Sequence, residues 1–177
     1  CLDIPTRGTY RIDGQDVREL DDTQLSHIRN KQVGFIFQGY NLIPSLTAYE
    51  NVELPLIYQN VSAFKRRDLV MDAMARVGVA ERYRHHPAEM SGGQQQPVAI
   101  ARAIATHPPI IMADEPTGAL DSHTGKEVQH FLQELNKGGS TVILITHDNS
   151  IAATARRVVR ISDGKIIQDL EQEVDWL

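Results

Sequence analysis

The chain has 177 residues, a formal net charge of −5, 41% hydrophobic residues and 23% charged residues. These values are close to globular averages and do not indicate a disordered chain, and a chain of this length can bury one core. We therefore expect a single domain over residues 1–177. The negative charge gives no support for a nucleic-acid partner, and no apolar run is long enough to span a membrane. The lone cysteine, Cys1, cannot form an internal disulfide, which is typical of a reducing compartment.

The first part of the chain predicts two strands. Residues 8–17 alternate in character around Asp13 and Gly14, a pair favoured in tight turns, and predict a short exposed strand and turn. Residues 33–37, VGFIF, form a short apolar run of the kind found in a covered parallel sheet.

A helical region follows from Thr47, where Thr47 and Glu50 have the spacing of a capping box. An apolar stripe at 70, 71, 74 and 77 ends at Gly78, as in an amphipathic helix. Residues 45–90 are therefore predicted to be mostly helical. With the SGGQ segment and the alanine-rich run after it, we place a helical insertion at 45–100 and a catalytic core in the remainder.

The second half of the chain alternates strands and helices. Strands are predicted at 109–114 and 141–146, with an amphipathic helix between them that ends before Gly138. Residues 158–168 predict a hairpin around Asp163 and Gly164. This order predicts an α/β fold with a mainly parallel sheet, a helical insertion and peripheral hairpins.

Polar residues stand where the three apolar strands end: Gln38 follows the strand at 33–37, Asp114 and Glu115 close the strand at 109–114, and His147 follows the strand at 141–146. In open α/β sheets, ligands collect beyond the carboxyl ends of the strands. Asp114 can hold Mg²⁺ through water, Gln38 can complete the coordination of the metal or the water, and Glu115 can act as general base. An acidic pair that closes a strand is more often a solvated loop or a helix cap, but the PTGALD directly after it favours catalysis.

The segment Ser91, Gly92, Gly93 and Gln94 precedes the helical run VAIARAIA. Free backbone N–H groups, the helix dipole and small side chains at such a helix start suit a phosphate, although a bare SGG is more often a flexible turn.

Two further candidates have structural alternatives. Asp121 extends the acidic site, or it caps the next helix. His147 alone is more often a surface histidine or a helix cap, but after a buried strand and level with Asp114 it can contact a terminal phosphate and the attacking water.

Taken together, these segments resemble the nucleotide-binding domain of ABC transporters, and most of all the branch of macrolide exporters and lipoprotein-release ATPases. FIFQ matches the Q-loop, MSGGQQQ the signature, IIMADEP the Walker B strand, GALD the D-loop and ITHD the switch-histidine loop. Five motifs in the family's order over nearly the whole chain make coincidence very improbable.

The resemblance implies a P-loop NTPase-like fold that binds ATP and Mg²⁺. It implies a head-to-tail dimer in which the signature, Ser91 to Gln94, closes on the γ-phosphate held by the other subunit. Glu115 would polarise the water, His147 would sense the γ-phosphate and Asp121 would communicate across the dimer. The partner would be a transmembrane permease, separate or fused, bound by the helical insertion, which places the chain in the cytoplasm on the inner face of the membrane.

Two departures from the family pattern stand out. No GxxxxGK(S/T) string occurs in the 177 residues, and the start CLDIPTRG matches the family's segment after that loop and its helix. We therefore expect the N-terminal strands and the P-loop to be missing, and the chain as given to be inactive. The other departure is Pro97, where this branch usually has Arg.

Two alternatives remain open. One is a non-catalytic interaction module that keeps the dimer and permease surfaces without turning over ATP. The other is an ABC-type ATPase of DNA repair or translation, which the lack of a long coiled-coil insertion or a tandem domain disfavours.

Overall fold

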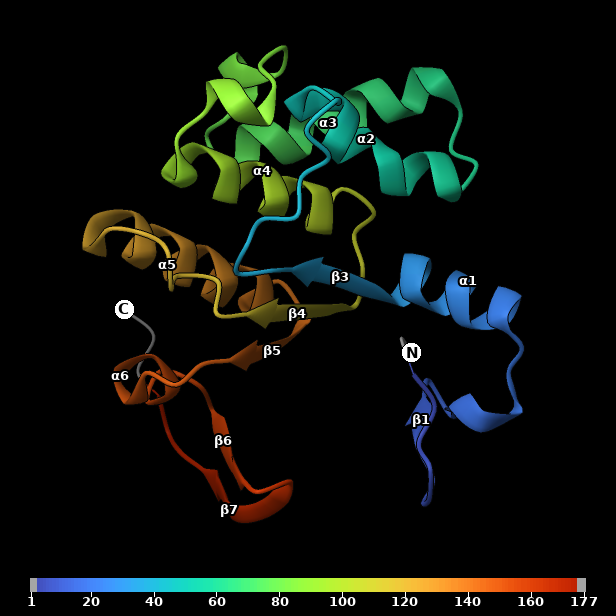
Figure 1. Ribbon diagram of the computed structural model, residues 1–177, viewed down its shortest axis with the longest axis vertical. Helices are drawn as coiled ribbons and strands as arrows, with labels where there is room; N and C mark the ends of the chain where they lie inside the picture. Colours follow the sequence, from blue (N-terminus) through green and yellow to red (C-terminus); the bar gives the residue numbers. More distant parts are fainter. Residues whose placement is uncertain (1–2, 175–177) are drawn as a thin grey trace.

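The computed structural model describes residues 3–174, so Cys1 lies outside the described residues. Figure 1 shows helices α2, α3 and α4 gathered at one end, strands β3, β4 and β5 in the middle beside α5, and the hairpin of β6 and β7 at the other end. The strands are β1 Arg11–Ile12, β2 Gln15–Asp16, β3 Val33–Ile36, β4 Ile110–Asp114, β5 Thr141–Ile145, β6 Arg157–Ser162 and β7 Lys165–Glu171. The helices are η1 Val17–Glu19, α1 Asp22–Gln32, α2 Ala48–Tyr58, α3 Ala63–Arg76, η2 Ala80–Arg82, η3 Pro87–Glu89, α4 Gly92–Ile104, α5 Ser122–Lys137 and α6 Asn149–Ala152.

The central sheet has the order β3-β4-β5, and both of its pairings are parallel. The pairing of β1 with β2 and that of β6 with β7 are antiparallel hairpins. Both hairpins turn at an Asp-Gly pair with positive φ, which is the backbone that a tight hairpin turn requires. The predicted α/β class with a mainly parallel sheet and peripheral hairpins is confirmed.

The helical region begins as its sequence predicts. Thr47 caps α2, because its hydroxyl oxygen accepts from the N–H of Glu50 while the Glu50 carboxylate accepts from the N–H of Thr47. In α3, Val70 and Met74 of the predicted stripe are fully buried. The strand that was expected at 33–37 ends one residue earlier, at Ile36.

The sequence analysis missed helix α1 and the short helix α6. Helix α1 is capped by Asp21, whose carboxylate accepts from the N–H of Gln24 while the Gln24 side chain accepts from the N–H of Asp21. Its mostly polar sequence buries only Leu25 and Ile28, so it carries almost no apolar periodicity.

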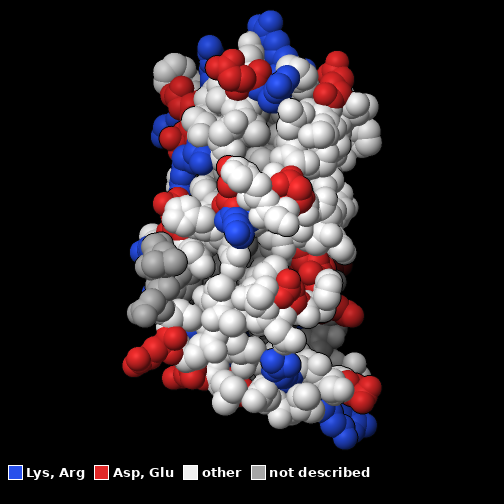
Figure 2. Space-filling model, turned by 90° about the vertical axis from the view of Figure 1, so that its left-hand side faces the viewer, with Lys and Arg blue, Asp and Glu red and all other residues white. Residues whose placement is uncertain are grey.

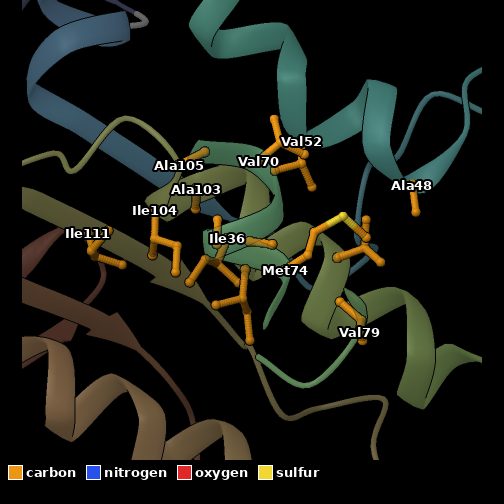
Figure 3. Packing of buried hydrophobic residues seen from close by; sticks show 14 of the residues in the cluster. Ile36, Ala48, Val52, Val70, Met74, Val79, Ala103, Ile104, Ala105 and Ile111 are labelled. Atoms are coloured by element: carbon orange, nitrogen blue, oxygen red, sulfur yellow. The ribbon is translucent and has the colours of Figure 1, made fainter. Parts of the chain in front are cut away.

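The sheet and the helical region share one hydrophobic core. Figure 3 shows Ile36 of β3 and Ile111 of β4 packed with Val70 and Met74 of α3 and Ile104 of α4. Helix α4 lies directly on β3, since a Cβ at Gly34 would collide with the backbone carbonyl of Ala103. The helix that begins at the SGGQ segment is therefore packed directly against β3 at Gly34.

The open face of β5 is apolar. Along this strand Val142 and Leu144 are half-buried, whereas Ile143 and Ile145 are 44% and 50% exposed. Within the described residues β5 is also the last strand of its sheet. Exposed apolar side chains on an end strand favour association with other chains.

Pro97 lies inside α4. It is the sixth residue of a helix that begins at Gly92, which is beyond the first turn. Proline has no N–H, so the carbonyl of Gly93 loses the helical donor that residue 97 would otherwise supply.

We predict that Pro97→Ala raises the free energy of unfolding by roughly 1–3 kcal/mol, because a helix-interior proline costs about 3 kcal/mol and part of that is offset in the unfolded chain. Urea denaturation measures the change. Pro44→Ala, in an exposed loop, is the control and should give a small loss. Equal midpoints for the parent and Pro97→Ala would contradict the prediction.

We also predict that the 177-residue chain associates as its concentration rises, and that the double change Ile143→Thr with Ile145→Thr reduces the association. Threonine retains the β-branched shape that suits a strand but is less apolar. Static light scattering measures the effect. The control is Ile57→Thr, since Ile57 has similar exposure, at 43%, but lies on a helix. A monodisperse parent at high concentration would refute the idea.

Candidate active site

Glu115 stands at the centre of the candidate site. Strand β4 ends at Asp114, and the N–H of Glu115 still donates to the carbonyl of Ile145 at 2.9 Å, one step beyond the ladder. The chain then turns sharply, because Glu115 has φ of 44° and its carbonyl accepts from the N–H of Gly118 at 3.1 Å. Such a positive φ is uncommon outside glycine, asparagine and aspartate, and strained backbone of this kind clusters at functional sites.

The structure brings His147 onto Glu115. The Glu115 Oε1 atom accepts from the backbone N–H of His147 at 2.8 Å and lies 2.5 Å from the ring Nδ1. The histidine side chain is 85% exposed, whereas that of Glu115 is only 16% exposed. The loop after His147 is closed by Asp148, whose carboxylate accepts from the N–H and the hydroxyl of Ser150. The backbone N–H and the ring of His147 thus hold the Glu115 carboxylate, while the imidazole remains exposed to solvent.

Gln38 and Asp114 flank this pair, and both are exposed. Gln38 follows β3, and a Cβ on Gly118 would lie only 3.1 Å from Gln38 Nε2, so Gly118 leaves room for that amide beside the turn after Glu115. The three strand ends therefore meet as the sequence predicts.

An oxygen-rich site of this kind suits Mg²⁺ only in part. Gln38 and Asp114 offer an amide oxygen and a carboxylate, which are ligands that Mg²⁺ accepts. Within residues 3–174 no group of three or more His, Cys, Asp or Glu side chains is placed to hold a metal ion. Since Mg²⁺ commonly binds through one or two carboxylates, waters and substrate phosphates, these residues fit a metal that arrives with a nucleotide.

The SGGQ turn opens α4, with Ser91 at the N-cap. The side chain of Gln94 accepts from the N–H of Ser91 at 3.1 Å, so it serves the turn's own backbone. A Cβ on Gly92 would lie 2.6 Å from the hydroxyl oxygen of Tyr40, and one on Gly93 would lie 3.8 Å from the side chain of Thr124. Gly92 thus permits close approach to the loop after Gln38, whereas a Cβ at Gly93 would make only an ordinary contact with the start of α5.

Asp121 caps the next helix, which was the structural alternative to a role in the acidic site. It is the N-cap of α5, where its carboxylate accepts from the N–H groups of His123 and Thr124 at 3.0 and 3.1 Å and from the Thr124 hydroxyl at 2.7 Å. These hydrogen bonds, that from the Thr124 side chain first, lower the pKa of Asp121 from its ordinary 3.8. A role across a dimer remains a prediction.

Sequence reasoning missed Arg102. Its guanidinium donates to the carbonyls of Tyr40 and Asn41 at 2.8 and 2.6 Å and so ties the loop after Gln38 to α4. Both loop residues have positive φ, and burial lowers the pKa of Arg102. The signal that could have found it is a single charge inside the apolar run VAIARAIA.

Comparisons with known proteins agree with this geometry. The family model described as "ABC transporter" matches residues 2–118. The chain is 52% identical over 173 residues to a pyoverdine export ATP-binding/permease protein of Pseudomonas fluorescens, and 50% identical over 169 residues to a macrolide export ATP-binding/permease protein of Hyphomonas neptunium. These matches cover 98% and 96% of the chain but only 26% of each relative, so the chain spans about a quarter of their length.

A solved structure is similar throughout the chain. The post-hydrolysis dimer of the ATP-binding cassette MJ0796 with ADP and Pi matches with a TM-score of 0.89 at 44% identity, over 97% of this chain and 76% of that one.

We predict that Asp121→Ala lowers the unfolding temperature at neutral pH, because α5 loses its cap. The pKa of Asp121 is lower in the folded chain than its ordinary 3.8. The stabilisation of the folded state by its carboxylate is therefore complete above pH 3.8 and is lost as the pH falls through the lowered pKa. The difference in unfolding temperature between Asp121→Ala and the parent should therefore become smaller below pH 3.8. Thermal scans by circular dichroism across this range measure it. The control is Asp163→Ala, which removes a carboxylate from the turn between β6 and β7 but caps no helix.

Proposed function

The chain belongs to the ABC transporter family, and we propose that it is part of the ATP-hydrolysing subunit or domain of an exporter. The observation that carries the proposal is the convergence of Gln38, Asp114, Glu115 and His147 at the carboxyl ends of three parallel strands. The printed names of the relatives support export as the purpose of the ATPase.

Each site residue then has a role in hydrolysis. Asp114 and Gln38 would hold Mg²⁺, which when bound would offset the charge of the phosphates. Glu115 would take the proton from the attacking water, and its 16% exposed side chain is held in place by His147. Ser91, Gly92, Gly93 and Gln94 would seat the γ-phosphate held by a second subunit at the N-terminal end of α4, where the N–H of Ser91 already donates to the Gln94 side chain and that of Gln94 to the carbonyl of Ser91.

His147 has a protonation requirement that arises from the contact with Glu115. If Nδ1–H donates to the Glu115 carboxylate, a neutral ring has only an acceptor left at Nε2. To donate to a γ-phosphate at the same time, the ring must be the imidazolium. The sensing step therefore either uses a charged ring or releases Glu115 when the phosphate arrives.

Two partners belong to the same proposal. A second copy of the domain would supply the opposing signature and place Asp121 near the dimer contact, and the similar MJ0796 cassette is dimeric. A permease, separate or fused, would dock on the helical insertion. Apolar side chains stand open there, with Tyr58 71% and Phe64 84% exposed.

The location proposed is the cytoplasm, on the inner face of the membrane, through that permease. No helix within residues 3–174 has the length and the apolar character needed to cross a bilayer. On the face drawn in Figure 2, acidic and basic side chains are interspersed, and with a net charge of −5 this gives no support to a nucleic-acid partner.

An interaction module without turnover is the second candidate, and the lack of a GxxxxGK(S/T) string in these residues favours it. That loop supplies the backbone cradle and the lysine for the β- and γ-phosphates, and phosphoryl transfer depends almost entirely on such positioning and charge. We propose that residues 1–177 alone do not turn over ATP, and that turnover needs a P-loop segment joined ahead of them.

We predict negligible phosphate release from the 177-residue chain, and turnover from the same chain extended by a P-loop segment. In the extended form, Glu115→Gln should reduce kcat by about 100-fold or more, which is the contribution typical of a general base. The amide adds no bulk, so ATP-dependent dimerisation in size-exclusion chromatography should persist.

The control is Glu81→Gln, an exposed glutamate on η2. Turnover by the unextended chain that is sensitive to Glu115→Gln would remove the need for the P-loop. Near-normal turnover by the extended Glu115→Gln variant would leave the acidic pair as metal ligands or a loop cap.

A further inference from the structure

Gln96 is a buried amide that joins two separate parts of the proposed site. It lies on α4, five residues after Ser91, and its side chain is completely buried. Its Nε2 donates to the carbonyl of Pro116 at 2.7 Å, across 20 residues of sequence. Pro116 directly follows Glu115. The helix that starts at the SGGQ turn is therefore tied to the residue next to the proposed general base.

The environment of Gln96 is a poor one for a residue that serves stability alone. Its Oε1 atom is buried and has no hydrogen-bond partner. A buried polar atom without a partner destabilises the folded state, and an apolar side chain of the same shape avoids that cost. The amide instead provides one directed contact, with the Pro116 carbonyl.

That contact uses the only backbone hydrogen-bonding group of Pro116, its carbonyl. Proline lacks an N–H, so its carbonyl is the one group through which the backbone at this position can be held by a hydrogen bond. Two other bonds hold the turn, from the N–H of Glu115 to Ile145 and from the N–H of Gly118 to Glu115, and both come from the strand ends or the turn itself. Gln96 is the tie that comes from the helical insertion.

We propose that Gln96 is a positioning residue for Glu115. By fixing the Pro116 peptide, it holds the Glu115 backbone at its φ of 44° and so aims the carboxylate. The inference rests on the proposed function, because it assumes that Glu115 acts on water. It adds that α4 connects two parts of the proposed machinery within one chain. One is the SGGQ turn, which would contact the nucleotide held by the partner, and the other is Glu115, which would act on the nucleotide held by this chain. Movement of the turn would then reach Glu115 through one side chain.

The test compares three variants in the P-loop-extended chain. Gln96→Met keeps the size of the side chain but cannot donate to Pro116. It should lower kcat by at least about tenfold, since small displacements of a catalytic group are costly, while KM for ATP stays unchanged. Its thermal unfolding should stay near that of the parent, because the loss of the unpaired Oε1 offsets the loss of the donor to the Pro116 carbonyl.

Gln96→Glu is a conservative variant with its own signature. A buried carboxyl has a raised pKa, and in its protonated form it can still donate to the Pro116 carbonyl, whereas the carboxylate cannot. Its kcat relative to the parent should therefore be highest at low pH and fall as the pH rises. A purely structural role predicts instead that any loss of kcat follows the loss of thermal stability measured at the same pH.

Gln129→Met is the matched control. Its Nε2 donates to the hydroxyl of Thr154 at 2.9 Å, which is also a link between distant parts of the chain, but it does not reach the acidic turn. This variant should retain the parent kcat. In the 177-residue chain, hydrogen exchange at the amides of Glu115 and Gly118 should be faster in Gln96→Met than in Gln129→Met.

A parent-like kcat and parent-like exchange in Gln96→Met would overturn the inference and leave the proposed function intact. So would a loss of kcat that appears equally in Gln129→Met and tracks thermal stability. If Glu115→Gln itself keeps near-normal turnover, both the proposed role of Glu115 and the positioning of it by Gln96 are wrong.

Discussion

One backbone hydrogen bond organises the candidate site, from the N–H of Glu115 to the carbonyl of Ile145. It extends the parallel pairing of β4 with β5 by one step and so places Glu115 beside the residues that come after β5. Because His147 lies two residues after Ile145, its N–H and ring then meet the same carboxylate oxygen. Glu115 adopts a positive φ where the chain turns sharply away from the strand.

The helical insertion acts on this strand-end site through α4. Its close packing on β3 at Gly34, the guanidinium of Arg102 on the loop after Gln38, and the amide of Gln96 on Pro116 all come from one helix. The SGGQ turn stands at the start of that helix. Its position relative to the acidic pair therefore depends on Arg102 and Gln96, side chains that have no proposed contact with a phosphate.

The features that could be predicted from the sequence depended on local signals. The apolar runs of β3, β4 and β5 and the polar residues after them indicated the strand ends, because both features lie within a few residues of each other. The Asp21 and Gln24 capping box of α1 is equally local, but the helix lacks the apolar stripe that would have indicated it. The contacts of Gln96 and Arg102 span 20 and about 60 residues, and nothing in their own neighbourhood names the partner.

Asp121 shows how one residue can carry both readings. Three hydrogen bonds from the first turn of α5 occupy its carboxylate, so the position is explained by helix capping alone. The same cap, however, fixes the side chain of Thr124, which lies 3.8 Å from the Cβ position of Gly93 in the SGGQ turn. A carboxylate that another subunit drew away from this cap would release Thr124 and loosen the start of α5 beside Gly93. If a second subunit contacts Asp121, as proposed, the cap gives that contact a route to the SGGQ turn, since the two stand at neighbouring helix starts.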